Sequence, residues 1–149
     1  MPRYFEDLEV GARILSPTAE VNEAESLDFA RTFDPQPMHL DPDFAARGKF
    51  HGLIVSGWYT AALVMRLVVQ ARLLEDTEIL GMAVEEMRWP APVRPGDTIQ
   101  SEIEVVWMKP SEKNPSFGIV KFRITTRNQH GQTVMIHAPI CWVPRRPAS

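Results

Sequence analysis

The sequence contains a single cysteine, Cys141, among its 149 residues. One cysteine excludes an internal disulfide and a cysteine-based metal cluster, and such a composition is typical of a protein from a reducing compartment. Cys141 lies in the apolar run Ile140–Val143. We therefore interpret it as a small buried hydrophobic residue and not as a reactive thiol.

Long apolar runs and clusters of positive charge are also missing. The longest apolar stretch, residues 53–65, is interrupted by Ser56, Gly57 and Thr60, and it is shorter than the roughly 20 residues of a membrane-spanning helix. Residues 1–11 carry acidic side chains where a secretory signal has an apolar segment. The formal net charge of −3 gives no electrostatic footprint for nucleic acid. We expect a soluble, cytoplasmic protein that binds neither membranes nor nucleic acid.

Several motifs of cofactor and metal chemistry are absent. There is no glycine-rich phosphate loop and no G-x-S-x-G motif. The spacing of the four histidines does not resemble a metal site, and we expect neither a metal nor a cofactor. Outside residue 39, we interpret His51 as a loop residue, His130 as a solvated turn residue and His137 as part of a strand.

The composition that remains is that of an ordinary globular domain. Hydrophobic residues make up 44% of the chain, which is enough for one domain with a core. No linker, internal repeat or low-complexity segment divides the sequence. We therefore predict a single domain over residues 1–149.

The first half of the chain carries helix signals. Asn22 is a suitable N-cap, and Glu25 follows at the spacing of a capping box, so a helix is expected until Pro35 interrupts it. Asp41 and Pro42 then form the start of a short second helix. Residues 56–75 predict a long third helix that is apolar nearly all round, and such a helix needs to be covered on most sides.

The second half carries strand signals over residues 80–89, 97–108, 117–126 and 132–143. Alternation places Trp107 on the same face as Ile103, and Pro139 suggests a sheet edge or a bulge in the last strand. The short turns between strands favour an antiparallel sheet. The sequence thus predicts the α+β class, and the apolar helix makes a hotdog fold, a sheet wrapped around one long buried helix, the specific expectation.

Asp34 and His39 are the residues best suited to chemistry. Pro35 and Pro37 restrict the backbone between them, so both side chains could be held in one geometry with little loss of entropy. An imidazole can give or take a proton at neutral pH, and a neighbouring carboxylate can orient it or share the proton. Alternatively, Asp34 forms a turn and His39 is a structural hydrogen-bonding group, because the spacing alone is a weak signal.

The wider sequence resembles the MaoC-like, or R-specific, enoyl-CoA hydratase family. The resemblance rests on FARTFDPQPMHLDPDFA at 29–45, VSGW at 55–58 and PVRPGDTI at 92–99, and the opening residues 3–11 are similar as well. The positions that match the hydratase signature are Phe29, Ala30, Asp34, Pro37, Met38, His39, Asp41 and Ala45. The departures are Phe33 in place of glycine, Gln36 in place of asparagine, and Ser56 where many members have histidine.

The resemblance implies a hotdog homodimer, or a larger assembly of such dimers, that acts on an acyl thioester of coenzyme A or a similar carrier. Asp34 and His39 would activate a water molecule that adds to a trans-2-enoyl thioester, or would catalyse the reverse dehydration. The backbone N–H of Gly57, at the start of the long helix, would stabilise the charge on the thioester oxygen. Gln36, Ser56 and Trp58 would contact the substrate.

Two other functions stay open at this point. A hotdog acyl-CoA thioesterase would typically place a carboxylate on the central helix, and this helix has no acidic residue between Ser56 and Arg72. A non-catalytic hotdog protein that binds acyl thioesters is the other possibility.

Overall fold

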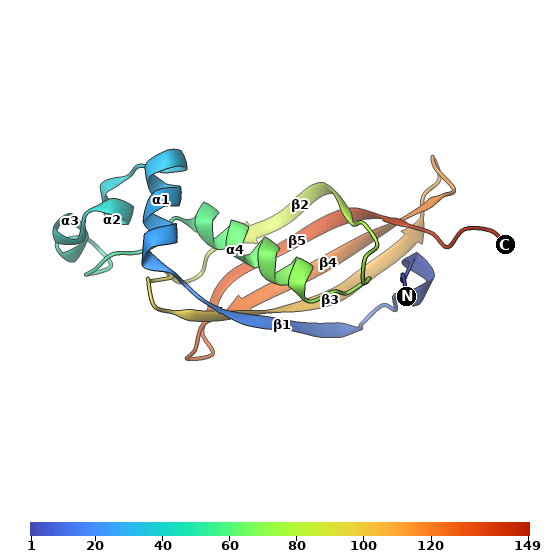
Figure 1. Ribbon diagram of the computed structural model, residues 1–149, viewed down its shortest axis with the longest axis horizontal. Helices are drawn as coiled ribbons and strands as arrows, with labels where there is room; N and C mark the ends of the chain where they lie inside the picture. Colours follow the sequence, from blue (N-terminus) through green and yellow to red (C-terminus); the bar gives the residue numbers. More distant parts are fainter.

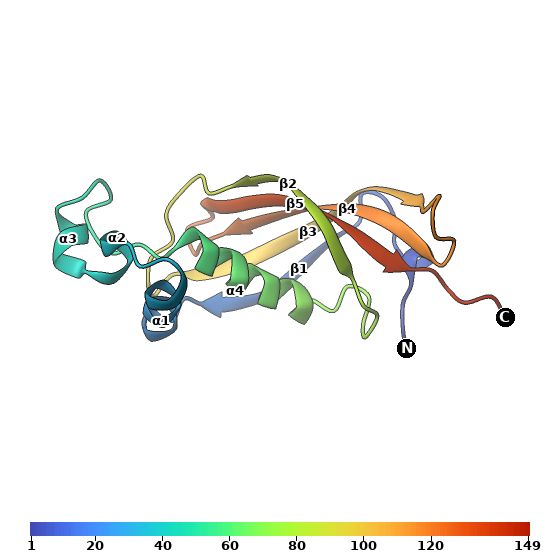
Figure 2. The same ribbon diagram turned by 90° about the horizontal axis from the view of Figure 1, so that it is seen from above.

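The computed structural model describes residues 1–149. After a 3-10 turn at Phe5–Asp7, the elements are β1 (Arg13–Glu20), α1 (Glu23–Phe33), α2 (Pro37–Leu40), α3 (Pro42–Ala46), α4 (Gly57–Gln70), β2 (Leu80–Arg88), β3 (Thr98–Pro110), β4 (Phe117–Arg127) and β5 (Thr133–Pro144). The five strands form one antiparallel sheet in the order β1-β3-β4-β5-β2. Helix α4 lies along one face of this sheet, and α1, α2 and α3 gather beyond one end of it (Figures 1 and 2). This is the α+β hotdog arrangement that the sequence predicts.

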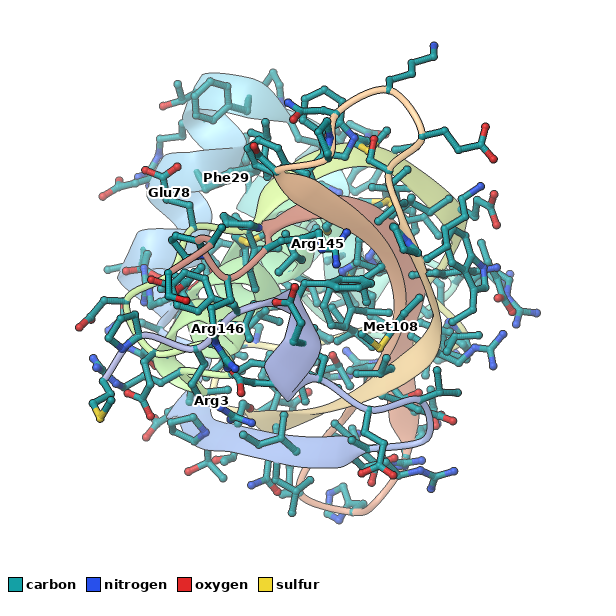
Figure 3. All side chains as sticks on the ribbon, turned by 90° about the vertical axis from the view of Figure 1, so that its right-hand side faces the viewer. Arg3, Phe29, Glu78, Met108, Arg145 and Arg146 are labelled. Atoms are coloured by element: carbon teal, nitrogen blue, oxygen red, sulfur yellow. The ribbon has the colours of Figure 1, made fainter.

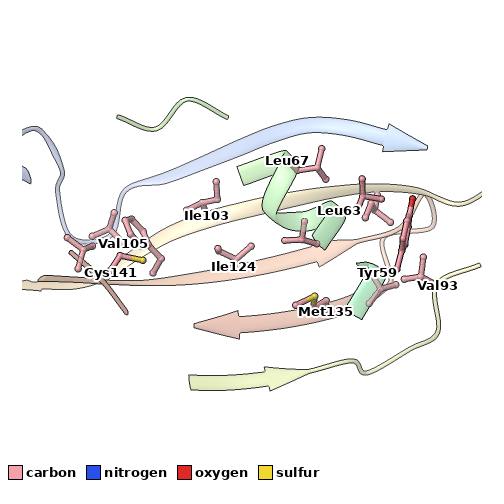
Figure 4. Packing of buried hydrophobic residues seen from close by; sticks show 14 of the residues in the cluster. Tyr59, Leu63, Leu67, Val93, Ile103, Val105, Ile124, Met135 and Cys141 are labelled. Carbon is pink, nitrogen blue, oxygen red and sulfur yellow. The ribbon is translucent and has the colours of Figure 1, made fainter. Parts of the chain in front are cut away.

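The core lies between α4 and the curved face of the sheet. Leu63 and Leu67 of α4 lie next to Ile103, Ile124 and Met135 of the strands (Figure 4), and all five side chains are buried. Burial of apolar surface of this kind is the main favourable contribution to folding. None of the helices combines the length and the apolarity needed to cross a membrane.

Helix α1 begins as its sequence predicts, but Glu25 serves a different purpose. The Asn22 side chain accepts a hydrogen bond from the Glu25 N–H at 2.8 Å, as an N-cap should. The Glu25 carboxylate does not complete a capping box. It accepts a hydrogen bond from the Tyr59 hydroxyl at 2.7 Å and lies 3.3 Å from the Arg66 guanidinium, so it joins α1 to α4.

Helix α4 is shorter and more exposed than predicted. It ends at Gln70, and residues 71–76 form turns in which Arg72 and Glu75 have φ angles of 52° and 57°. The Arg72 guanidinium binds the carboxylates of Glu75 and Asp76 and holds these turns together. One face of α4 is not covered within the chain, because Met65 and Trp58 are more than half exposed.

Two details of the sheet also differ from the prediction. The pairing of β3 with β4 shifts register between Val105 and Trp107. This bulge turns Trp107 to the face of its partner Lys121, and Met108 packs against the core instead. Strand β5 is interior and not an edge, because it lies between β4 and β2. The irregularities near Pro139 occur in β2, where the register shifts on both sides of Val84, the residue that pairs with Pro139.

The two chain termini meet at the end of the sheet opposite α1–α3 (Figure 1). Arg145 and Arg146 follow β5 and lie at this end (Figure 3), where they pair with Glu6 and Asp7 of the first turn. These contacts close the end of the molecule that is remote from the helices described next.

Candidate active site

The segment between α1 and α3 is built from local stop and start signals. Helix α1 ends at Phe33, and the Asp34 N–H still bonds to the Ala30 carbonyl at 2.9 Å. Pro35 prevents the helix from continuing, and Pro37 opens the single turn of α2 that carries His39. The Asp34 carboxylate and the His39 ring are thereby brought to the same side of the loop.

His39 is buried and has a partner at each ring nitrogen. Nδ1 lies 2.9 Å from the Ile54 carbonyl oxygen, and Nε2 lies 3.2 Å from Oδ2 of Asp34. A carbonyl oxygen can only accept a hydrogen bond, so Nδ1 must carry a proton. In the neutral ring, Nε2 therefore presents a free lone pair on the side of Asp34.

Asp34 is held by two side-chain donors. The Ser56 hydroxyl donates to Oδ2 at 2.6 Å, and the Gln36 amide donates to Oδ1 at 2.7 Å. These two hydrogen bonds, Ser56 first, hold the pKa of the Asp34 carboxyl below its usual value, and His39 lowers it further when its ring is protonated. Asp34 is thus an anion at neutral pH.

Ser56 begins α4 as well as holding Asp34. Its hydroxyl oxygen accepts from the Trp58 N–H at 3.2 Å while its hydrogen goes to the carboxylate. The residue is fully buried. Ser56 does not line the cavity, and its hydroxyl is directed to Asp34, so its contact with substrate stays a prediction.

Gly57 is the first residue of α4, and its N–H has no acceptor within the chain. A side chain at this position would meet the indole of Trp89, because an added Cβ would lie 2.9 Å from Cε2. Glycine is thus required by the close approach of Trp89. The free N–H and the positive end of the helix dipole favour a negative charge at this point.

Asp34, His39 and Gly57 line one cavity of about 580 Å³, and Gln36 and Trp58 line it as well. The three residues predicted to be catalytic are therefore brought together. Carboxylate, imidazole and backbone amide around one cavity are suited to moving a proton and stabilising an oxyanion.

Sequence reasoning missed three groups at this site. Trp89 and Lys49 line the cavity, and Lys49 is its basic residue. The carbonyl of Ile54 fixes the tautomer of His39. No motif marks these residues, and Ile54 and Trp89 meet their partners His39 and Gly57 only across 15 or more positions of the chain.

A second cavity of about 840 Å³ lies between α4, β2 and the sheet. It is larger, but its lining is mostly apolar, and its buried titratable groups are His137 and Cys141. Burial lowers the pKa of His137 and raises that of the Cys141 thiol to about 11. No group of three or more histidine, cysteine, aspartate or glutamate side chains is placed to hold a metal ion anywhere in the chain.

The family model described as "MaoC like domain" matches residues 8–128, which is most of the chain. The protein belongs to the MaoC-like dehydratase family. The match covers the segment with Asp34 and His39 and the start of α4.

Relatives that are named for an enzymatic activity support this membership in the MaoC-like family. A 3-hydroxybutyryl-CoA dehydratase of Methylorubrum extorquens is 37% identical over 74% of this chain and 68% of that protein. An (R)-specific enoyl-CoA hydratase of Rhodospirillum rubrum is 28% identical over 96% of this chain and 93% of that protein. The crystal structure of a MaoC-like dehydratase from R. rubrum has a TM-score of 0.91 and 41% identity, over 97% of this chain and 99% of that one.

Proposed function

We propose that this protein hydrates trans-2-enoyl thioesters of coenzyme A to 3-hydroxyacyl thioesters, or catalyses the reverse dehydration. The observation that carries the proposal is the position of Asp34 Oδ2, 3.2 Å from His39 Nε2, in a cavity that Gly57 also lines. The names of the two relatives above, a dehydratase and a hydratase of CoA thioesters, agree with it.

In this mechanism a water molecule binds in the cavity beside the pair, within hydrogen-bond reach of both the carboxylate of Asp34 and Nε2 of His39. The anionic carboxylate accepts one of its hydrogens, and the lone pair on Nε2 takes the other as the water oxygen attacks C3 of the enoyl group. The electron pair of the double bond moves toward the thioester oxygen, where the Gly57 N–H stabilises the developing charge. The proton on Nε2 then passes to C2, so that one water molecule is added overall.

The surroundings of His39 suit it for this proton transfer. The Ile54 carbonyl keeps the proton on Nδ1, so Nε2 is the nitrogen that is free to act as a base. The ring becomes an imidazolium when it takes the proton, and the carboxylate of Asp34 beside it stabilises that charge. In the dehydration direction the same groups act in the reverse order.

We also propose a homodimer, or a larger assembly of dimers. A set of apolar side chains on α4 and the edge strand β2 is exposed in the single chain: Trp58, Met65, Val69, Leu80, Met82 and Val84. An exposed apolar face on an edge strand and the adjacent helix is typical of a protein interface. A second copy of the chain would cover it.

Purified protein with crotonyl-CoA tests the reaction. Loss of the absorbance of the conjugated enoyl group, with no free thiol, is the expected result. Release of free CoA thiol would indicate a thioesterase instead. Binding of the thioester with neither change would support a non-catalytic binding protein.

A further inference from the structure

The two cavities follow one another along the same pair of elements. On α4, Trp58 lines the smaller cavity and Ala61 lines the larger one. On the chain of β2, Met87 lines the larger cavity, and Trp89, just past the strand, lines the smaller one. Residues three apart on a helix and two apart on an extended chain share a face. The cavities are therefore neighbours, and Trp58 and Trp89 stand where one gives way to the other.

Trp58 and Trp89 contact one another at this junction. Their ring centroids are 5.4 Å apart and their planes are inclined by 76°, an edge-to-face arrangement in van der Waals contact. The two rings leave no space for a methylene chain to pass between them.

Trp89 is fixed in this position from the other side. Its indole lies so close to Gly57 that an added Cβ there would be 2.9 Å from Cε2 and 3.1 Å from Nε1. The ring therefore has no room to move toward the start of α4. Since the Gly57 N–H is the proposed partner of the thioester oxygen, the tryptophan pair lies within a few carbon atoms of the reacting group.

We propose that the Trp58–Trp89 pair closes the acyl site and restricts this protein to short-chain 2-enoyl thioesters. This inference rests on the proposed function and names its substrate class. The larger cavity beyond the pair is lined mostly by apolar side chains, among them the buried Ile103, Ile124 and Met135 of the sheet. It would receive the tail of a longer acyl chain once either tryptophan is replaced by a smaller residue.

The size of the expected effect follows from the apolar character of the larger cavity. Each methylene group that leaves water for an apolar site improves binding roughly fourfold. A chain with several more methylene groups than crotonyl should therefore gain at least about tenfold when the passage opens. The gain should be found mainly in KM, because the reacting atoms are unchanged.

The test is the ratio of kcat/KM for trans-2-decenoyl-CoA to that for crotonyl-CoA. For the unmodified protein we expect the ratio to favour crotonyl-CoA by at least about tenfold. Trp58→Ala and Trp89→Ala should each shift the ratio toward decenoyl-CoA by at least about tenfold. Trp89→Phe, which keeps part of the bulk, should give a smaller shift in the same direction and serves if an alanine variant does not fold.

Trp142→Ala is the matched control. Trp142 forms another aromatic pair, with its ring centroid 5.8 Å from that of Phe117, and it lines neither cavity. The same truncation there should leave the ratio unchanged.

Two results would overturn the inference while leaving the proposed function standing. One is equal hydration of both substrates by the unmodified protein. The other is a uniform loss with both substrates in the tryptophan variants, which would assign the pair to packing or to the subunit interface. Absence of hydration with either substrate would instead overturn the proposed function, and this inference with it.

Discussion

Two histidines of this protein are buried to the same degree and have opposite surroundings. His39 is 5% exposed and His137 is 6% exposed. His39 has a carbonyl oxygen at one nitrogen and a carboxylate at the other. His137, in β5, has no hydrogen-bond partner at Nδ1 and lies among apolar side chains that lower its pKa.

The comparison shows that burial alone does not prepare an imidazole for catalysis. A ring becomes useful as a base when one nitrogen is fixed as a donor and the other faces a group that stabilises the charged form. His39 has both features and His137 has neither. The difference comes from the neighbours, Ile54 and Asp34, and not from the depth of the site.

The largest difference between the two histidines should appear in the rate of hydration. We expect His39→Gln and Asp34→Asn each to lower kcat/KM for crotonyl-CoA by at least about a hundredfold, with the fold retained by circular dichroism. His137→Gln should change the rate of the folded protein by less than about threefold, since it removes no positioned proton-transfer group. Near-normal turnover in either dyad variant would show that Asp34 and His39 are not the acid–base pair.

Removal of the Ser56 hydroxyl, which holds Asp34, should have the next largest effect on the rate of hydration. Ser56→Ala removes the strongest of the hydrogen bonds that lower the pKa of Asp34, so that pKa should rise. The acid limb of the kcat profile should therefore move to higher pH. At neutral pH the carboxylate stays ionised, and we expect a loss of roughly tenfold there because it is no longer held in place.

Asn22→Ala is the matched control for Ser56→Ala, because it also removes an N-cap, here at the start of α1. It should lower the free energy of unfolding by roughly 1 kcal/mol. Asn22 makes no hydrogen bond to Asp34, so the acid limb of the kcat profile should stay in place in the Asn22→Ala variant. An acid limb that does not move in Ser56→Ala would show that the hydroxyl only caps α4.

The effect of burying His137 should appear in the pH dependence of the free energy of unfolding. The unfolded chain takes up a proton at the ordinary histidine pKa of 6.5, whereas burial lowers the pKa of His137 in the folded protein. Protons therefore favour the unfolded state as the pH falls below that value, with a slope of at most about 1.4 kcal/mol per pH unit. Urea unfolding at about pH 7.5 and about pH 5.5 should show a smaller loss of stability in His137→Gln than in the unmodified protein. An equal loss in both would mean that His137 is protonated in the folded state as easily as in the unfolded chain.

The smallest effect on the rate of hydration is expected at Gln36, which also holds Asp34. Gln36→Asn shortens the amide that donates to Asp34 Oδ1 by one methylene group, and the loop must rearrange to keep the bond. We expect crotonyl-CoA hydration to stay within about threefold, because the Ser56 bond to Asp34 remains. A higher rate would show that Gln36 is an adaptation to another substrate, and a loss as large as that of Ser56→Ala would make Gln36 an equal support.

The parts of the fold that were predictable are those set by neighbouring residues. Asn22 starts α1, and Asp41 with Pro42 starts α3, because caps and prolines act on the next few backbone groups. The strand alternation of β4 was likewise visible in the sequence. The face of Trp107 and the interior place of β5 depend on which strands pair and where the register shifts, and neither is encoded locally.

The candidate site also has parts that could be predicted from the sequence and parts that could not. Asp34 and His39 are five positions apart, and the prolines between them could be read directly. The roles of Ser56, Ile54 and Trp89 arise from contacts across 15 or more positions, as in the bond from His39 to Ile54 and the bond from Ser56 to Asp34. Such contacts exist only after the chain has folded, so no local pattern of residues could predict them.

The double use of the Ser56 hydroxyl ties two events together. The same hydroxyl caps the first turn of α4 and holds the carboxylate of Asp34, and the amide of Gly57 belongs to that turn as well. Fraying of this single turn therefore dismantles the acid–base pair and the oxyanion donor at once, while the sheet stays intact. Warming should thus inactivate the protein before it melts.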